Sequence, residues 1–150
     1  MQTPVKAETQ VPDKADSLVE LRFPAKPERL CLVRSLVKSA AMNSGCSSEL
    51  CDKLVIALNE ACMNVIQHAY KGDESGEIVL EILNNGSDLL FRLKDYAAPI
   101  DLERVKPRDL DEIRPGGLGV HFIREIMDEC RMGHLDKGAG NYLEMIKRID

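Results

Sequence analysis

Three polar residues recur at four-residue spacing in the longest helical segment of the sequence. Glu60, Asn64 and His68 lie within residues 47–70, which no glycine or proline interrupts before Gly72. Side chains four apart project from the same helix face, so a carboxylate, an amide and an imidazole share one ridge. A carboxylate can accept a proton and an amide oxygen is a hard ligand for Mg²⁺, although such a ridge is more often plain surface.

A glycine segment supplies a second candidate site. Residues 116–119 read Gly-Gly-Leu-Gly and open directly onto a predicted helix at 120–129. Closely spaced glycines let backbone N–H groups approach an anion, and a helix N-terminus adds a positive dipole end, so the segment suits a phosphate. It lacks the P-loop pattern and does not follow a strand, so a flexible turn that caps a helix is the alternative.

Residues 47–70 are predicted to form the central helix, about 35 Å long. Ser47 or Ser48 can cap the first turn. An apolar stripe beside the polar ridge recurs at three- and four-residue spacing and should face the core. This stripe consists of Leu54, Leu58, Ala61, Val65 and Ala69.

The other elements follow from periodicity and from the turn residues that end each one. Alternating β-favouring residues predict strands, and apolar residues at helical spacing predict amphipathic helices. The predicted elements are a strand at 17–23, a helix at 27–43, a hairpin of strands 77–83 and 89–95, the helix at 120–129, and a closing hairpin of strands 130–135 and 142–149.

Two segments lack periodicity. Residues 1–16 are polar and contain proline, so we expect a flexible N-terminal arm, followed by a single domain over 17–150. Residues 97–114 carry two prolines and many charges. Long irregular connections are usually functional, so we expect residues 100–115 to form a lid over a bound ligand.

Composition narrows the classes of partner. The chain has 150 residues, 44% of them hydrophobic, which fits one globular domain with a sizeable core. The net charge of −5 and the lack of a basic run argue against a nucleic-acid binder. We expect no membrane span and no secretory leader, and the five cysteines without CxxC spacing indicate reduced thiols. We therefore expect a cytoplasmic protein whose partner is a nucleotide or another protein.

The order of these motifs resembles a known superfamily. Glu60 and Asn64, then His-Ala-Tyr at 68–70, Asp95 at a strand end and Gly-Gly-Leu-Gly at 116–119 resemble the GHKL ATPases, which include gyrase and the histidine kinases. More narrowly, the stretches ALNEACMNVIQHAYKGD and RPGGLGVHFIREIMDE resemble the anti-sigma-factor serine/threonine kinases of bacterial partner switching. The resemblance spans nearly all of the predicted domain.

The resemblance implies a role for each matching residue. Glu60 would be the catalytic base toward the attacking hydroxyl, Asn64 the Mg²⁺ ligand, and Asp95 the acceptor for the adenine amino group. Asp95 alone is commonly a turn former, but its place between the other two motifs favours nucleotide binding. The residues implied to contact the cofactor, ATP or ADP with Mg²⁺, are Asn64, Asp95, Ala97, Gly116, Gly117, Leu118, Gly119 and Val120.

The implied fold is the GHKL (Bergerat) ATP-binding fold. It is an α/β two-layer sandwich, in which three helices cover one face of a mixed, largely antiparallel sheet of four or five strands. The family continues Asp-x-Gly-x-Gly, whereas this chain reads Asp95-Tyr96-Ala97-Ala98-Pro99. Alanine disfavours positive φ, so this departure bears on how the base is held.

Two functions follow from the resemblance. In the first, the protein is a serine/threonine kinase that binds Mg-ATP, phosphorylates a STAS-type anti-sigma-factor antagonist and sequesters a sigma factor or a similar regulator, as a homodimer. In the second, it is a weakly catalytic or non-catalytic module that regulates by sequestering a partner. The retained Glu60 favours the first function, and the absent glycines after Asp95 favour the second.

Overall fold

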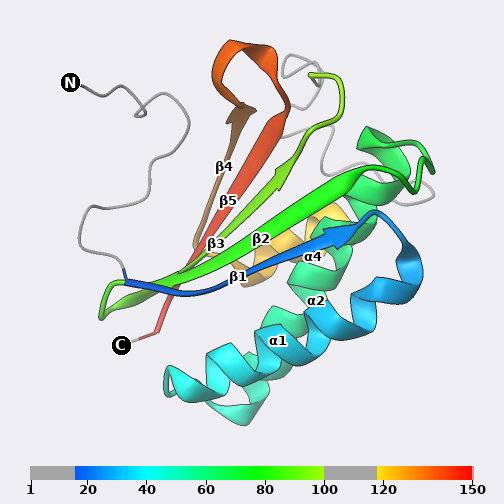
Figure 1. Ribbon diagram of the computed structural model, residues 1–150. Coiled ribbons are helices and arrows are strands. Elements are labelled where there is room, and N and C mark those ends of the chain that lie inside the picture. Colours follow the sequence, from blue (N-terminus) through cyan, green and yellow to red (C-terminus); the bar gives the residue numbers. More distant parts are fainter. Residues whose placement is uncertain (1–15, 100–117, 150) are drawn as a thin grey trace.

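The computed structural model describes residues 16–99 and 118–149, which form a five-stranded sheet with helices packed on one face (Figure 1). Short turns complete the elements: 3₁₀ turns at Pro27–Arg29 and Asp136–Gly138, and a π-turn at Val65–Ala69. The strands and helices are β1 (Asp16–Pro24), α1 (Leu30–Asn43), α2 (Ser48–Asn64), β2 (Glu77–Asn84), β3 (Asp88–Asp95), α4 (Leu118–Ile126), β4 (Glu129–His134) and β5 (Asn141–Arg148).

The strand order is β1-β2-β3-β5-β4, and each neighbouring pair is antiparallel. The α/β two-layer sandwich with a largely antiparallel sheet is thus confirmed, and the described strands contain no parallel pair. Both predicted hairpins are present as β2–β3 and β4–β5. This order places β3 at the centre of the sheet, with β2 on one side and β5 on the other.

The hydrophobic core lies between the sheet and helices α1, α2 and α4. Side chains alternate along each strand, so every second residue of β2 and β3 points toward the helices. Helix α2 packs against both α1 and α4, and it therefore lies at the middle of the helical layer. The largest fully buried side chains of this core include Phe91, Leu54, Leu58, Ile78, Leu80, Ile82, Leu93, Met145, Val33 and Val37.

The central helix begins as predicted. Ser47 is its N-cap, and the Ser47 hydroxyl oxygen accepts a hydrogen bond of 3.1 Å from the backbone N–H of Leu50. Leu54, Leu58 and Ala61 are buried, as the apolar stripe predicted. This end of α2 follows the ordinary rules of helix capping and amphipathic packing.

The last turn of the central helix differs from the prediction. After Asn64 the backbone changes to a π-turn, and the N–H of Tyr70 bonds to the carbonyl of Val65, five residues back, at 2.9 Å. The extra residue in this turn shifts the register of the faces. Val65 and Ala69 are therefore only partly buried, whereas Ile66 enters the core. The prediction of one uninterrupted α-helical stripe to residue 69 was wrong in this turn.

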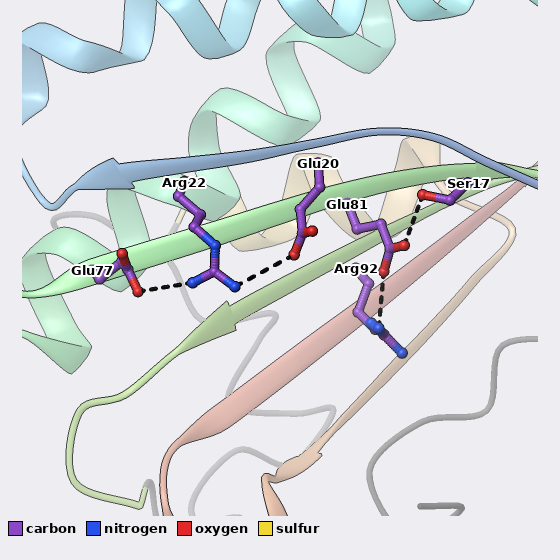
Figure 2. Close-up of polar contacts among 6 residues, drawn as sticks. All are labelled: Ser17, Glu20, Arg22, Glu77, Glu81 and Arg92. Carbon is purple, nitrogen blue, oxygen red and sulfur yellow. Dashed lines mark hydrogen bonds and ion pairs between the residues drawn. The ribbon is translucent and has the colours of Figure 1, made fainter.

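The sheet face opposite the helices carries polar pairs between strands (Figure 2). Arg22 on β1 donates to Glu77 on β2 at 3.2 Å, and Arg92 on β3 donates to Glu81 on β2 at 2.8 Å. Ser17 donates to the second oxygen of Glu81 at 2.8 Å. Such pairs contribute little stability each, about 0–1 kcal/mol, but opposite charges on neighbouring strands favour this register.

Some sequence predictions lie outside the described residues. These are the arm at 1–16, apart from Asp16 in β1, and the lid at 100–115. Within residues 16–99 and 118–149, no helix is long and apolar enough to cross a membrane. All five cysteines are free thiols, and Cys51 and Cys62 are buried as the expected small apolar residues.

The helix cap gives the first testable prediction. Ser47→Ala removes the acceptor for the Leu50 N–H, so the free energy of unfolding should fall by about 1 kcal/mol. Ser48→Ala is the matched control, because Ser48 is the first residue of the helix and is exposed, and it should change stability by less than about 0.5 kcal/mol. Urea unfolding of both variants measures the difference, and equal losses would show that Ser47 does not act as a cap.

Candidate nucleotide site

Two of the predicted site residues lie on the central helix. Glu60 and Asn64 are one turn apart on α2, and both are half-buried. Asn64 is the last residue of α2, directly before the π-turn. His68, which an uninterrupted α-helix would stack on the same ridge, lies within the π-turn and is exposed. The structure therefore retains Glu60 and Asn64 as a pair and separates His68 from them.

The Glu60 and Asn64 side chains have no competing partner among the described residues. No ion pair engages the Glu60 carboxylate, and no hydrogen bond engages the Asn64 amide, within residues 16–99 and 118–149. By contrast Asn59, on another face of α2, accepts a hydrogen bond of 2.9 Å from Arg34 on α1. A free carboxylate and a free amide oxygen remain available for a proton and for a metal ion.

Asp95 is a buried carboxylate at the end of the central strand. Its exposed fraction is 5%, and its Oδ1 atom accepts two hydrogen bonds, from Asn141 Nδ2 at 2.9 Å and from the Ala97 N–H at 3.0 Å. Burial raises the pKa of Asp95, and these two hydrogen bonds partly offset the rise by stabilising the charged form. The fold thus keeps a charge in a desolvated place.

The second carboxylate oxygen of Asp95, Oδ2, accepts no hydrogen bond from any of the described residues. Within residues 16–99 and 118–149, the Nε atom of Arg92 is the sole side-chain nitrogen or oxygen that is buried from solvent and has no hydrogen-bond partner. The unpartnered Oδ2 therefore retains access to solvent, where it can accept a hydrogen bond from an amino group of a ligand.

Strand β5 holds Asp95 in place from the other side. Asn141 is the cross-strand partner of Asp95, and its side-chain amide also donates to the Ala98 carbonyl at 3.1 Å. Gly140 has φ of 153°, and a Cβ there would collide with the Asp95 carbonyl oxygen and lie 2.9 Å from the Cα of Tyr96. Sequence reasoning missed Asn141 and Gly140, because only the pairing register of two distant segments brings them to Asp95.

The alanine that replaces the family glycine adopts an ordinary backbone. Ala97 closes a turn in which its N–H donates to the Asp95 side chain two residues earlier. Among the described residues, Lys71 is the one non-glycine residue with positive φ, so Ala97 has no left-handed strain. The absent glycine at this position is therefore compatible with the buried Asp95.

Tyr70 connects the central helix to the backbone after Asp95. The Tyr70 hydroxyl accepts a hydrogen bond of 2.7 Å from the Tyr96 N–H and donates one of 2.6 Å to the Glu77 carbonyl. Asn64 precedes Tyr70 by six residues, and the π-turn Val65–Ala69 lies between them. Tyr70 therefore links the π-turn that follows Asn64 to the backbone that follows Asp95.

The glycine segment is described only in part. Gly116 and Gly117 lie outside the described residues, whereas Leu118, Gly119 and Val120 form the first turn of α4. The helix begins at Leu118, two residues earlier than predicted. Its other end is fixed in the core through the buried Ile123 and Met127.

The sequence matches a known domain family over most of its length. Residues 23–147 match the histidine kinase-like ATPase domain. The serine-protein kinase RsbW of Listeria monocytogenes is 38% identical over 129 residues, which cover 81% of this chain and 82% of that protein. RsbW of Bacillus subtilis is 31% identical over 123 residues, with 76% of each protein covered.

Solved structures share the same fold. The RsbU and RsbW domains of Rv1364c from Mycobacterium tuberculosis align with a TM-score of 0.61 at 16% identity, over 87% of this chain and 31% of that longer chain. The mycobacterial sensor histidine kinase MprB aligns with a TM-score of 0.54 at 11% identity, over 66% of this chain and 72% of that chain. The resemblance seen in the sequence is confirmed: this chain belongs to the histidine kinase-like ATPase domain family and, within it, to the RsbW-type serine-protein kinases.

Proposed function

We propose that this protein binds Mg-ATP and transfers the γ-phosphoryl group to a serine or threonine hydroxyl of a partner protein. The observation that supports the proposal is Asp95, a buried carboxylate with one oxygen hydrogen-bonded by the protein and the other without a partner among the described residues. A desolvated charge with a free acceptor is costly for the fold alone and useful for recognising an amino group. The names of the RsbW relatives, serine-protein kinases, support the same reaction.

In this proposal Asp95 Oδ2 accepts a hydrogen bond from the adenine amino group, and Ala97 lies beside the base. Gly116, Gly117, Leu118, Gly119 and Val120 surround the phosphates, where the N-terminus of α4 favours negative charge. The amide oxygen of Asn64 suits Mg²⁺, because it is a hard ligand without a competing partner among the described residues. When bound, Mg²⁺ would neutralise phosphate charge.

The transfer step uses Glu60 as the base. The Glu60 carboxylate accepts the proton of the attacking hydroxyl while that oxygen forms a bond to the γ-phosphorus. The bond between the γ-phosphorus and the β–γ bridging oxygen breaks, and its electron pair leaves with ADP. The products are a phosphorylated partner, ADP and a protonated Glu60. Most of the acceleration in such reactions comes from positioning and charge stabilisation.

The partner proposed as acceptor is a STAS-type anti-sigma-factor antagonist, and the regulator that the protein sequesters is a sigma factor or an analogous protein. We also propose that the protein is a homodimer and that it is located in the cytoplasm. The alternative is a sequestering module with little or no turnover, which the missing glycines after Asp95 favour. The ordinary backbone of Ala97 weakens that alternative at one of the two positions.

The roles of Glu60 and Asn64 differ, so their mutants should fail differently. Glu60→Gln keeps the size of the side chain but removes the base, so the variant should bind Mg-ATP and lose phosphotransfer by about 10²- to 10⁴-fold. Asn64→Ala removes a metal ligand present already in the bound state, so both Mg-ATP affinity and transfer should fall. Calorimetric titration and transfer of labelled phosphate to candidate STAS proteins measure the two quantities.

Matched controls lie on the same helical layer. Glu49→Gln alters an exposed glutamate in the first turn of α2, and Asn43→Ala alters an exposed asparagine at the end of α1. Both variants should keep the wild-type Mg-ATP affinity and phosphotransfer. Equal phosphotransfer by wild type and Glu60→Gln would exclude Glu60 as the base. A wild-type protein that binds the partner yet phosphorylates no hydroxyl would replace the kinase with the sequestering module.

Asp95→Asn should weaken binding and leave the fold stable. Loss of one charge-assisted hydrogen bond to adenine should cost about 1.5–3 kcal/mol in ADP affinity.

The same variant should change how stability depends on pH. Because burial raises the Asp95 pKa, the folded protein binds the carboxyl proton of Asp95 more tightly than the unfolded chain does. The stability associated with the protonated carboxyl is full below about pH 4 and is lost as pH rises through the raised pKa. The melting temperature of Asp95→Asn relative to wild type should therefore increase from about pH 4 to pH 8.

Asp73→Asn provides a control of opposite sign. Hydrogen bonds from the Ser75 side chain and backbone lower the pKa of the exposed Asp73. The ionised Asp73 carboxylate contributes to stability above its ordinary pKa, and this contribution is lost as pH falls through the lowered pKa. Asp73→Asn should therefore be less stable than wild type at neutral pH.

Unchanged ADP affinity in Asp95→Asn would mean that Asp95 is a turn residue only.

A further inference from the structure

Tyr70 occupies the junction between the central helix and two strand ends. It follows the π-turn Val65–Ala69, and its N–H closes that turn on the Val65 carbonyl. The next residues turn the chain sharply, since Lys71 has φ of 54° and the Gly72 N–H bonds back to the Ile66 carbonyl at 3.0 Å. The direction in which the Tyr70 side chain leaves the helix is therefore fixed by several backbone hydrogen bonds.

The Tyr70 hydroxyl bridges two strands where their ladder ends. The pairing of β2 with β3 runs to Ile78 and Asp95. One residue beyond, the Tyr96 N–H donates to the hydroxyl at 2.7 Å and the hydroxyl donates to the Glu77 carbonyl at 2.6 Å. A single oxygen thus stands between backbone groups of the two strands. Desolvation of the hydroxyl is the largest cause that raises the Tyr70 pKa, so the group remains a protonated donor at neutral pH.

The Tyr70 ring leaves room for no side chain at residue 76. A Cβ on Gly76 would lie 2.6 Å from the Tyr70 Cζ atom, closer than packed carbon atoms approach. The Gly76 carbonyl also accepts a hydrogen bond of 2.9 Å from the Ala25 N–H, which fixes this backbone against the end of β1. The ring therefore packs directly on the backbone of Gly76, the residue before β2, and a side chain at residue 76 would displace the ring and its hydroxyl.

We propose that Tyr70 is a positioning residue that sets the Asp95 carboxylate relative to Asn64 and thereby sets the preference of the site for adenine. This inference rests on the proposed function, because it assigns Asp95 to the base and Asn64 to the phosphate end. The Tyr96 N–H held by Tyr70 directly follows Asp95, and Tyr70 is the residue by which the π-turn after Asn64 reaches it. One phenol therefore connects the two ends of the site.

Nucleobase preference is the property that separates positioning from a purely structural role. Adenine presents an amino group to Asp95, whereas hypoxanthine presents a carbonyl oxygen at the same place. A site built to accept a hydrogen bond discriminates strongly against such an analogue only while its acceptor is held in place. If Tyr70 merely stabilised the fold, its removal would lower the melting temperature without changing the ratio of ADP to IDP affinity.

Tyr70→Phe tests the proposal, since it keeps the ring on Gly76 and removes the bridging oxygen. With magnesium present, calorimetric titrations should show that ADP affinity falls by about tenfold or more and that the ADP-over-IDP ratio moves toward one. The amide hydrogen of Tyr96 should also exchange faster with solvent, a readout that needs no nucleotide. Gly76→Ala places a Cβ against the ring and keeps the hydroxyl, so it should reproduce the loss of preference.

Tyr142→Phe is the matched control. Tyr142 also packs on a glycine, since a Cβ on Gly133 would lie 2.7 Å from its hydroxyl. It follows Asn141 on β5 and pairs with Lys94, so its side chain points to the opposite face of the sheet from Asn141, and Tyr142→Phe should leave both affinities unchanged. A Tyr70→Phe protein that is folded and keeps the wild-type ADP-over-IDP ratio overturns the positioning role and leaves the proposed function standing. An equal loss in Tyr142→Phe overturns it too. A wild-type protein that does not bind ADP overturns the proposed function and this inference together.

Discussion

The burial of the Asp95 carboxylate is the constraint on which the surrounding structure depends. A desolvated charge must be hydrogen-bonded, and the partners of Asp95 come from separate parts of the chain: Asn141 from β5 and the Ala97 N–H from the turn after β3. The close approach of β5 in turn requires glycine at residue 140. The Tyr70 hydroxyl accepts a hydrogen bond from the N–H of Tyr96, the residue after Asp95, so the end of the central helix also contacts this region.

Local signals account for most of the fold. Helices α1 and α2, the hairpins β2–β3 and β4–β5 and the Ser47 cap were all predictable, because periodicity, capping and turn residues act within a few positions of one another. The π-turn was not predictable in this way. Residues 65–69 continue a good helical pattern, and the additional residue is accommodated through tertiary contacts of Tyr70 that no local pattern contains.

The candidate site likewise contains residues that the sequence pattern indicates and residues that it does not. Glu60, Asn64 and Asp95 could be proposed from residue type and from the order of motifs, and in the structure Tyr70 links the π-turn after Asn64 to the backbone after Asp95. Asn141, Gly140 and the bridging role of Tyr70 depend on strand register, since residues 70, 95 and 141 meet only after the sheet has formed. An isolated asparagine after a glycine carries no signal of such a contact.

The two ends of helix α2 show how stability and site geometry are separated in this fold. The N-terminal end has a serine cap, a buried apolar stripe and the Arg34–Asn59 hydrogen bond, features that stabilise without constraining a ligand. The C-terminal end carries the π-turn, the positive φ of Lys71 and the contacts of Tyr70. Unfavourable backbone persists only where surrounding contacts over-determine it. Because Tyr70 is bonded to both strands, a regular α-turn would rotate it away from Glu77 and Tyr96, so the π-turn and the placement of Asp95 depend on each other.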